Sequence, residues 1–329
     1  MFNDVRRVSS MHPSAASIEL SVPDDKGRNV TGGCHRQQYY KHVAEPVSNK
    51  VSPDVILSSM IGDEITEMVA EILDVHGFKC GLQRVVAENS FYIPEIQLNG
   101  RCDFIGYDHT NKEFIGIEVK SVGEWKAGKC IERPADEHIM QSFIYLDHYQ
   151  TAYPSLMFKK WYILYVSRTE NYTIKARKHG SPLTMIWDSY ITIDPKDKCA
   201  VIHTHNGAEK WKDCTRDNLY NRYKKLLAYL NTNTIPPKDY EIQYSDERIV
   251  ALYKTNGLTR KMDIEKVEKW LKKGAPPGKL KVEIGDGECN FCNYKATCWP
   301  DIVAKYVDPV SDIVIPKEES PKTNEAPWI

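Results

Sequence analysis

Two short stretches, Gly100-Arg-Cys-Asp103 and Phe114-Ile-Gly-Ile-Glu118-Val-Lys120-Ser121, carry the most information in this chain. Side chains alternate between the two faces of a strand, so Glu118 and Lys120 point to one face and the apolar residues around them to the other. Asp103 belongs to the preceding strand, and pairing of the two strands can bring its carboxylate beside Glu118. Carboxylates held a few ångströms apart repel each other, and a divalent cation relieves that repulsion. Oxygen ligands favour Mg²⁺ or Mn²⁺ over Zn²⁺.

These residues predict a site for metal-assisted hydrolysis of a phosphodiester. A lysine beside the metal, here Lys120, can orient an attacking water or help to deprotonate it. The tripeptide Asp/Glu-x-Lys is weak evidence by itself, because it recurs at Asp24–Lys26, Glu124–Lys126 and Asp194–Lys196. A strand with an ordinary charged, solvated face is therefore the alternative.

The hydrophobic patterns predict an α/β protein with a mixed central sheet flanked by helices. Asn99-Gly100 is a strong hairpin signal, because both central residues of a type I′ turn need positive φ. The nearly continuous apolar run Trp161–Ser167 is typical of a central strand buried on both faces. Strands are expected at 18–22, 91–98, 101–107, 114–121, 161–167 and within 172–210. Helices are expected at 61–76, 135–149, 215–230 and 263–273.

The composition indicates a folded protein without a strong charge bias. Hydrophobic residues make up 41% of the 329 residues, enough for a core. Lys and Arg number 44 against 45 Asp and Glu, which excludes histone-like binding of nucleic acid through bulk positive charge. No apolar run is long enough for a membrane helix, and Met1–Ser10 lacks the features of a secretory signal. We therefore expect a cytoplasmic location and no membrane partner.

Together these stretches resemble the PD-(D/E)xK nucleases, and within them the RecB-type branch that includes CRISPR adaptation nucleases and many phage exonucleases. That branch carries Gln-x-x-x-Tyr on the helix after the lysine strand, and Gln141-Ser-Phe-Ile-Tyr145 stands at this place. Gln141 and Tyr145, one helical turn apart, share a face that suits contact with the active site or the DNA backbone. An ordinary helix is the alternative for this pair.

The resemblance implies a restriction-endonuclease-like core and assigns roles to its residues. Asp103, Glu118 and the carbonyl oxygen of Val119 would bind the metal, and Lys120 would position the attacking water. In-line attack would then leave 5′-phosphate and 3′-hydroxyl products.

One departure from the family concerns a metal-ligand histidine that the branch places on the first helix, four residues after a glycine. Counting from Gly62 reaches Thr66 instead. Glu67 is the nearest side chain able to bind a metal, and a solvated helix face is the alternative for it.

Three of the nine cysteines are crowded together, as Cys289-x2-Cys292-x5-Cys298. Clustered cysteines in a cytosolic chain usually bind metal. In the resembling family, the iron–sulfur members take one cysteine from before the nuclease core and three from after it. Cys34, in Thr31-Gly-Gly-Cys34-His-Arg-Gln-Gln-Tyr-Tyr40, fits the first of these places. The resemblance implies a [4Fe–4S] cluster that joins the N- and C-terminal segments, and a zinc site without Cys34 is the alternative.

Two basic stretches are candidate contacts for DNA. Cations interleaved with aromatic residues suit single-stranded nucleic acid, because bases stack on rings and phosphates pair with charges. Lysines that merely solvate a helix are the alternative. The first stretch comprises Arg216, Arg222, Lys224 and Lys225 with Tyr220, Tyr223 and Tyr229, and the second comprises Arg260, Lys261, Lys266, Lys269, Lys272 and Lys273.

The chain therefore divides into a flexible N-terminal arm (1–30), a nuclease core (31–168), an insertion of unassigned role with mixed strands and basic helices (169–285), a cysteine segment (286–310) and a disordered tail (311–329). The expected function is a Mg²⁺- or Mn²⁺-dependent DNA exonuclease in recombination, repair or phage DNA metabolism. One alternative is a CRISPR-type end-trimming nuclease, or one that acts only with a recombination or replication partner. The other is a catalytically silent DNA-binding subunit.

Overall fold

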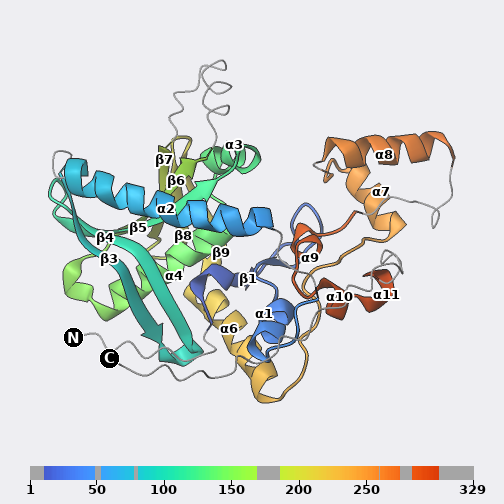
Figure 1. Ribbon diagram of the computed structural model, residues 1–329, viewed down its shortest axis with the longest axis horizontal. Coiled ribbons are helices and arrows are strands. Elements are labelled where there is room, and N and C mark those ends of the chain that lie inside the picture. Colours follow the sequence, from blue (N-terminus) through green and yellow to red (C-terminus); the bar gives the residue numbers. More distant parts are fainter. Residues whose placement is uncertain are drawn as a thin grey trace, which may run out of the picture.

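The computed structural model describes residues 11–48, 53–77, 81–168, 186–258, 260–274 and 284–303. Its centre is a seven-stranded sheet in the order β3-β4-β5-β6-β7-β8-β9, and a separate two-stranded sheet pairs β1 with β2 (Figure 1). β5 and β6 run parallel, and the other neighbouring strands of the large sheet are antiparallel. The strands are β1 (Ser17–Glu19), β2 (Val30–Gly32), β3 (Leu82–Ile93), β4 (Leu98–Asp108), β5 (Glu113–Val122), β6 (Lys160–Ser167), β7 (Ile186–Ile193), β8 (Cys199–Thr204) and β9 (Gly207–Thr215).

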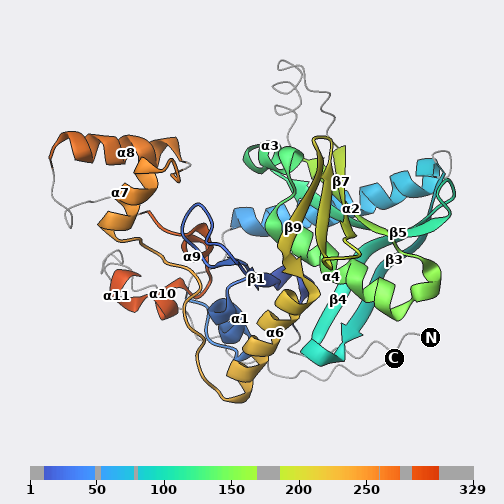
Figure 2. The ribbon, with the colours of Figure 1, turned by 180° about the vertical axis from the view of Figure 1, so that it is seen from behind.

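Helices cover both faces of the large sheet, which confirms the predicted mixed α/β arrangement. The helices are α1 (His35–His42), α2 (Pro53–His76), α3 (Glu124–Glu132), α4 (Asp136–Ala152), α6 (Arg216–Asn231), α7 (Asp246–Lys254), α8 (Lys261–Lys272), α9 (Gly287–Asn290), α10 (Lys295–Cys298) and α11 (Pro300–Val303). α2 lies across one face (Figure 1), where Val69 packs with Ile117 and Val119. α4 lies on the other face (Figure 2), and the apolar side chains of α4 and α6 join the largest core cluster.

The central strand β6 follows its prediction on one face and departs from it on the other. Trp161, Ile163 and Tyr165 are fully buried in the α4-side core, whereas Tyr162 and Leu164 on the opposite face are half-buried. Trp161 pairs with Gly116 of β5. A Cβ at position 116 would come within 2.2 Å of the Trp161 indole, so only glycine lets the ring lie flat over the strand.

The predicted turn at Asn99-Gly100 is wrong. Both residues lie inside β4, and the hairpin instead closes through a 3-10 turn at Pro94–Ile96, with Ile93 paired to Leu98. Gly100 is needed for packing, because a Cβ there would lie 2.1 Å from Cζ of Phe91 on β3. Tertiary packing therefore overrides the local turn preference.

Residues 11–30 do not form a loose arm. Met11, Ala16 and Ile18 are buried in the main core, and β1 pairs with β2. Residues 186–231 likewise belong to the main sheet and its covering helix, through β7 to β9 and α6. The predicted boundary at residue 168 therefore divides a continuous core.

Parts of several predictions lie outside the described residues, namely residues 1–10 of the arm, the beginning of the 172–210 region (172–185), residues 304–310 and the whole 311–329 tail. Within the described ranges, no helix combines the length and the apolar character needed to cross a membrane.

Candidate active site and cysteine pocket

The hairpin of β4 and β5 brings Asp103 to the level of Glu118. Phe104 pairs with Ile117 in the antiparallel register, so Asp103 and Glu118 are the next residues on the two strands. The backbone N–H of Val119 donates to Asp103 Oδ2 at 2.7 Å. This bond fixes the Asp103 carboxylate against the backbone of the strand that carries the other two residues of the motif.

Glu118 is only 3% exposed and lies on the α4 side of β5. Its Oε1 accepts hydrogen bonds from Lys120 Nζ at 2.5 Å and from Gln141 Nε2 at 2.7 Å. Its Oε2 is buried and has no hydrogen-bond partner within the described residues. A buried carboxylate oxygen without a partner is costly, so this atom calls for a proton or a ligand.

Burial raises the pKa of both carboxyl groups. For Glu118 the pKa rises to about 8, because burial outweighs the opposing charge of Lys120 and the charge of Asp103 adds to the rise. For Asp103 burial also raises the pKa, against the bond from the Val119 N–H and the charge of Lys120. A divalent cation between the two groups would favour both charged forms, and the all-oxygen donor set suits Mg²⁺ or Mn²⁺.

The two residues of the Gln-x-x-x-Tyr motif do share one face of α4, and that face meets the site. Gln141 Nε2 lies 2.9 Å from the Tyr145 hydroxyl, which in turn donates to the Arg101 carbonyl oxygen at 2.9 Å. Both side chains are buried. The chain of bonds runs from β4 through α4 to the Glu118 carboxylate, so it positions that carboxylate.

His138 also belongs to this neighbourhood, although the sequence assigns it no role. It lies one helical turn before Gln141, and its Nδ1 shares a hydrogen bond of 2.8 Å with the Tyr165 hydroxyl. Burial, and then the positive charge of Lys120, lower the pKa of His138 to about 3, which keeps the ring neutral. The only sequence signal for His138 was its spacing from Gln141.

Glu67 is not brought to the site. Its side chain is exposed on α2. The buried face of α2 meets Ile117 and Val119, which point away from Glu118. Within the described residues, no three His, Cys, Asp or Glu side chains stand close enough together to hold a metal ion. Thr66, at the position expected for histidine, donates its hydroxyl to the Gly62 carbonyl oxygen at 3.1 Å.

The four predicted cluster cysteines line one pocket between the start of α1 and the C-terminal segment. Cys34 is the N-cap of α1, Cys289 lies in α9, and Cys298 ends α10. Together with Cys292 they share the pocket with Arg36, Lys238 and Lys295, among others. Burial raises the pKa of Cys34 and of Cys289 to about 12. Four thiols are the donor set of an iron–sulfur cluster or zinc, although no three of them stand close enough together here to hold a metal ion.

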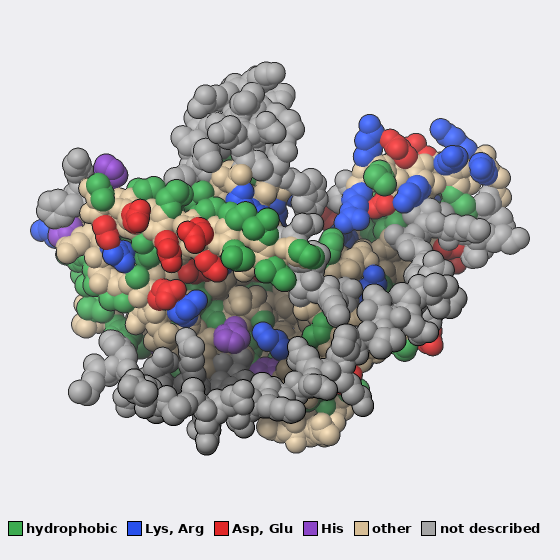
Figure 3. Space-filling view, viewed as in Figure 1, with side chains coloured by type: hydrophobic (Ala, Val, Ile, Leu, Met, Phe, Trp, Pro, Cys, Tyr) green, Lys and Arg blue, Asp and Glu red, His purple; other side chains and the backbone are tan. Residues whose placement is uncertain are grey.

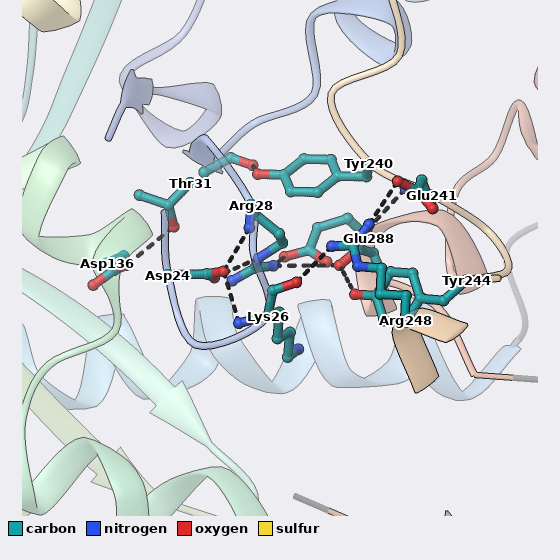
Figure 4. A network of polar contacts seen from close by, with 12 residues as sticks. Asp24, Lys26, Arg28, Thr31, Asp136, Tyr240, Glu241, Tyr244, Arg248 and Glu288 are labelled. Atoms are coloured by element: carbon teal, nitrogen blue, oxygen red, sulfur yellow. Dashed lines mark hydrogen bonds and ion pairs between the residues drawn. The ribbon is translucent and has the colours of Figure 1, made fainter. Parts of the chain in front are cut away.

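A buried polar network holds the start of the cysteine segment (Figure 4). Asp286 is 1% exposed and accepts hydrogen bonds from the Glu241 backbone N–H at 2.8 Å and from the Tyr244 hydroxyl. Arg28, in the loop between β1 and β2, donates to Glu288 at 3.0 Å and lies 3.7 Å from Asp286. The protein's own side chains therefore place Cys289 near the N-terminal segment.

The first basic stretch, on α6, is engaged with the rest of the same chain. Arg222 is buried and donates to Asp239 Oδ2 at 2.9 Å. Lys224 and Lys225 each pair with a glutamate of the same chain, and two of the three interleaved tyrosines are buried in the core. This stretch therefore serves packing and internal ion pairs, and it does not present the open row of cations and rings that the sequence led us to expect.

No protein-family model and no curated protein matches this chain. Among solved structures, it is similar to one described as "Crystal structure of SSO0001", with 19% sequence identity and a TM-score of 0.28 over 50% of this chain. The matched part spans 65% of that chain. So low a TM-score carries no argument about fold or activity.

Proposed function

We propose that this protein is a Mg²⁺- or Mn²⁺-dependent deoxyribonuclease that hydrolyses phosphodiester bonds from DNA ends. One observation carries the proposal: Glu118 Oε2 is buried and finds no partner in the described part of the chain, on a carboxylate whose other oxygen is held by Lys120 and Gln141. A divalent cation held between Glu118 and Asp103 would supply this oxygen with a partner.

Each residue of the site would have its own role in hydrolysis. Asp103, Glu118 and the Val119 carbonyl would hold the divalent cation, which when bound supplies positive charge for the phosphoryl oxygens and acidifies water. Lys120 would orient the attacking water from its place beside Glu118. Gln141 and Tyr145 would keep the Glu118 carboxylate in one orientation, which matters because small displacements of a reacting group cost large factors in rate.

The cysteine pocket supports the structural part of the proposal. Four thiols that come from opposite ends of the described chain line it. A [4Fe–4S] cluster bound there would pin the C-terminal segment to α1, with zinc as the less favoured occupant. The polar network of Asp286 already holds this segment near α1, and the four thiols would move closer together to bind the cofactor.

The decisive assay uses purified protein, Mn²⁺ and end-labelled single- and double-stranded DNA. Wild type should shorten the labelled strands from an end, and Lys120→Ala should remove nearly all cleavage while the protein still unfolds in one cooperative transition. Asp103→Ala and Glu118→Ala should do the same, and the double variant should be little worse than either, because the residues act as a unit. Lys210→Ala is the matched control, since Lys210 also pairs with a carboxylate but lies on β9. Full activity of Lys120→Ala, or no cleavage by wild type with either metal and either DNA, would overturn the proposal.

A further inference from the structure

α7 and α8 form a small lobe with a core of its own. Ile249 and Leu252 of α7 pack with Val267 and Trp270 of α8 in a cluster separate from the main core. Figures 1 and 2 both place this lobe beyond one end of α2, beside the C-terminal helices. Arg248 ties the lobe to the rest of the molecule, because it donates to the Lys26 carbonyl oxygen and to Glu241, each at 2.6 Å.

The outward face of α8 is the second basic stretch. Val267 and Trp270 point into the lobe, whereas Lys266, Lys269 and Lys273, spaced three and four residues apart, share one exposed stripe. Residues 260–273 carry six cations against three carboxylates, and all six cations are exposed.

Almost none of these cations forms an ion pair in the described part of the chain. Within the described residues, the one ion pair that any of them makes joins Lys261 to Glu265 at 3.9 Å, and both side chains are largely exposed. An exposed pair of this kind contributes little. The contrast with α6 is clear, because there the cations face carboxylates of the same chain.

The charge of the molecule is therefore segregated. Figure 3 shows Lys and Arg gathered over α8, whereas Asp and Glu gather with apolar side chains over α2. The sequence of α2 contains no lysine or arginine. A polyanion would be attracted to α8 and repelled from α2, although the whole chain has a net charge of only −1.

We infer that the outward face of α8 binds the phosphate backbone of a DNA strand whose end occupies the catalytic site. This inference rests on the proposed function. The only aromatic residue of α8, Trp270, is buried, so the surface offers charges without rings on which bases could stack. The contact is therefore to phosphates and independent of base sequence. A helix of 12 residues is about 18 Å long, which is enough to follow several phosphates.

The test measures binding separately from cleavage. All proteins carry Lys120→Ala and are assayed in chelator, with a fluorescent single-stranded oligonucleotide over a series of salt concentrations. Replacing Lys266, Lys269 and Lys273 together by Ala should raise the dissociation constant at least tenfold. It should also reduce the slope of log K against log salt by about 2, because each lost phosphate contact on a single strand is worth about 0.7. The thermal melt should not change, since these side chains are exposed.

The matched control removes the same charge elsewhere. Replacing Lys210, Lys224 and Lys225 by Ala also removes three exposed lysines, but each of them pairs with a carboxylate. The control should leave the salt slope unchanged. Two results would overturn the inference: equal salt slopes for the α8 variant and its parent, or equal losses of DNA affinity in both triple variants. The cations of α8 would then serve some other acidic partner.

The same substitutions in protein with an intact Lys120 distinguish this inference from the proposed function. If wild type cleaves DNA and the α8 variant cleaves equally well at every salt concentration, the inference fails while the nuclease function stands. If wild type does not cleave but the α8 variant loses DNA binding, the nuclease function fails and the surface assignment stands as a binding site.

Discussion

Gln141 Nε2 lies 2.7 Å from Glu118 Oε1, although the two residues are 23 positions apart. This contact joins α4 to β5 at the point where Lys120 also donates to the same oxygen. Because two donors meet one oxygen, the carboxylate has a fixed orientation, and its second oxygen is buried with no partner among the residues that the structure describes. The relationship is therefore the basis of the predictions about catalysis and stability.

The first prediction concerns the stability of the metal-free protein. Burial raises the pKa of Glu118 from 4.5 to about 8, so folding favours the protonated carboxyl group. Between these two values the folded state binds a proton that the unfolded state has lost, and stability therefore falls as the pH rises through this window. Glu118→Gln, which cannot ionise, should lose that part of the decline. Measured in chelator, the melting temperature of Glu118→Gln minus that of wild type should increase from pH 5 to pH 8. Parallel curves for the two proteins would contradict the assignment.

The second prediction separates positioning of the carboxylate from simple packing. Tyr145→Phe removes the donor to the Arg101 carbonyl and the acceptor for Gln141. Loss of a buried hydrogen-bond partner should cost about 1–3 kcal/mol of unfolding free energy. It should also lower kcat about tenfold or more, because Glu118 then loses its fixed orientation.

Tyr149→Phe is the control for this change. Tyr149 is equally buried one turn further along α4, but its hydroxyl contacts Asn89 and Cys102 instead of the site. A similar loss of stability with unchanged kcat is expected. If both variants lose the same fraction of activity, Tyr145 acts only through packing.

The third prediction concerns the first helix. Glu67 is exposed on α2 and lies apart from Asp103 and Glu118, so Glu67→Gln should leave the Mn²⁺ concentration for half-maximal cleavage unchanged. Asp103→Asn should raise that concentration about tenfold or more. A Mn²⁺ requirement that rises in Glu67→Gln would show that the helix moves toward the site when the metal binds.

The sequence was a good guide wherever one element could be recognised from its own side chains. The alternation of 114–121 sufficed to place Glu118 and Lys120 on one face, and helical periodicity sufficed for α4 and α6. The sequence was a poor guide where packing between elements determines the local structure. Asn99-Gly100 has the local chemistry of a turn, yet the ring of Phe91 occupies the space where a side chain at position 100 would be.

Other features depend on contacts that no spacing reveals. Arg222 belongs to a basic, aromatic stretch, but its partner Asp239 turns it into a buried ion pair. The bond between Gln141 and Glu118 requires the crossover from β5 through α3 and α4 to β6. α7 had a readable signal, since Ser245 caps it by accepting from the Arg248 N–H at 3.3 Å, with acidic residues in the first turn.

The last prediction concerns the cysteine pocket, and the Cys34→Ala variant is its most informative test. Anaerobically purified protein should be brown, and replacing any one of Cys34, Cys289, Cys292 or Cys298 by Ala should bleach it. The same variants should melt at a lower temperature, because binding of the cofactor is coupled to folding and joins α1 to the C-terminal segment.

Cys199→Ala and Cys214→Ala are the matched controls, since these buried thiols lie on β8 and β9, outside the pocket. Cys102 and Cys130 are also predicted to be dispensable for the colour, as is Cys80, which lies outside the described residues. The substitution at position 34 discriminates between the two cofactors because it is remote in sequence from the other three thiols. A zinc site confined to the C-terminal segment would keep its metal in Cys34→Ala, whereas an iron–sulfur cluster with four thiolate ligands would lose iron. Metal analysis that finds stoichiometric zinc in wild type, unchanged in Cys34→Ala, would replace the cluster with zinc and leave Cys34 as the half-buried N-cap residue of α1.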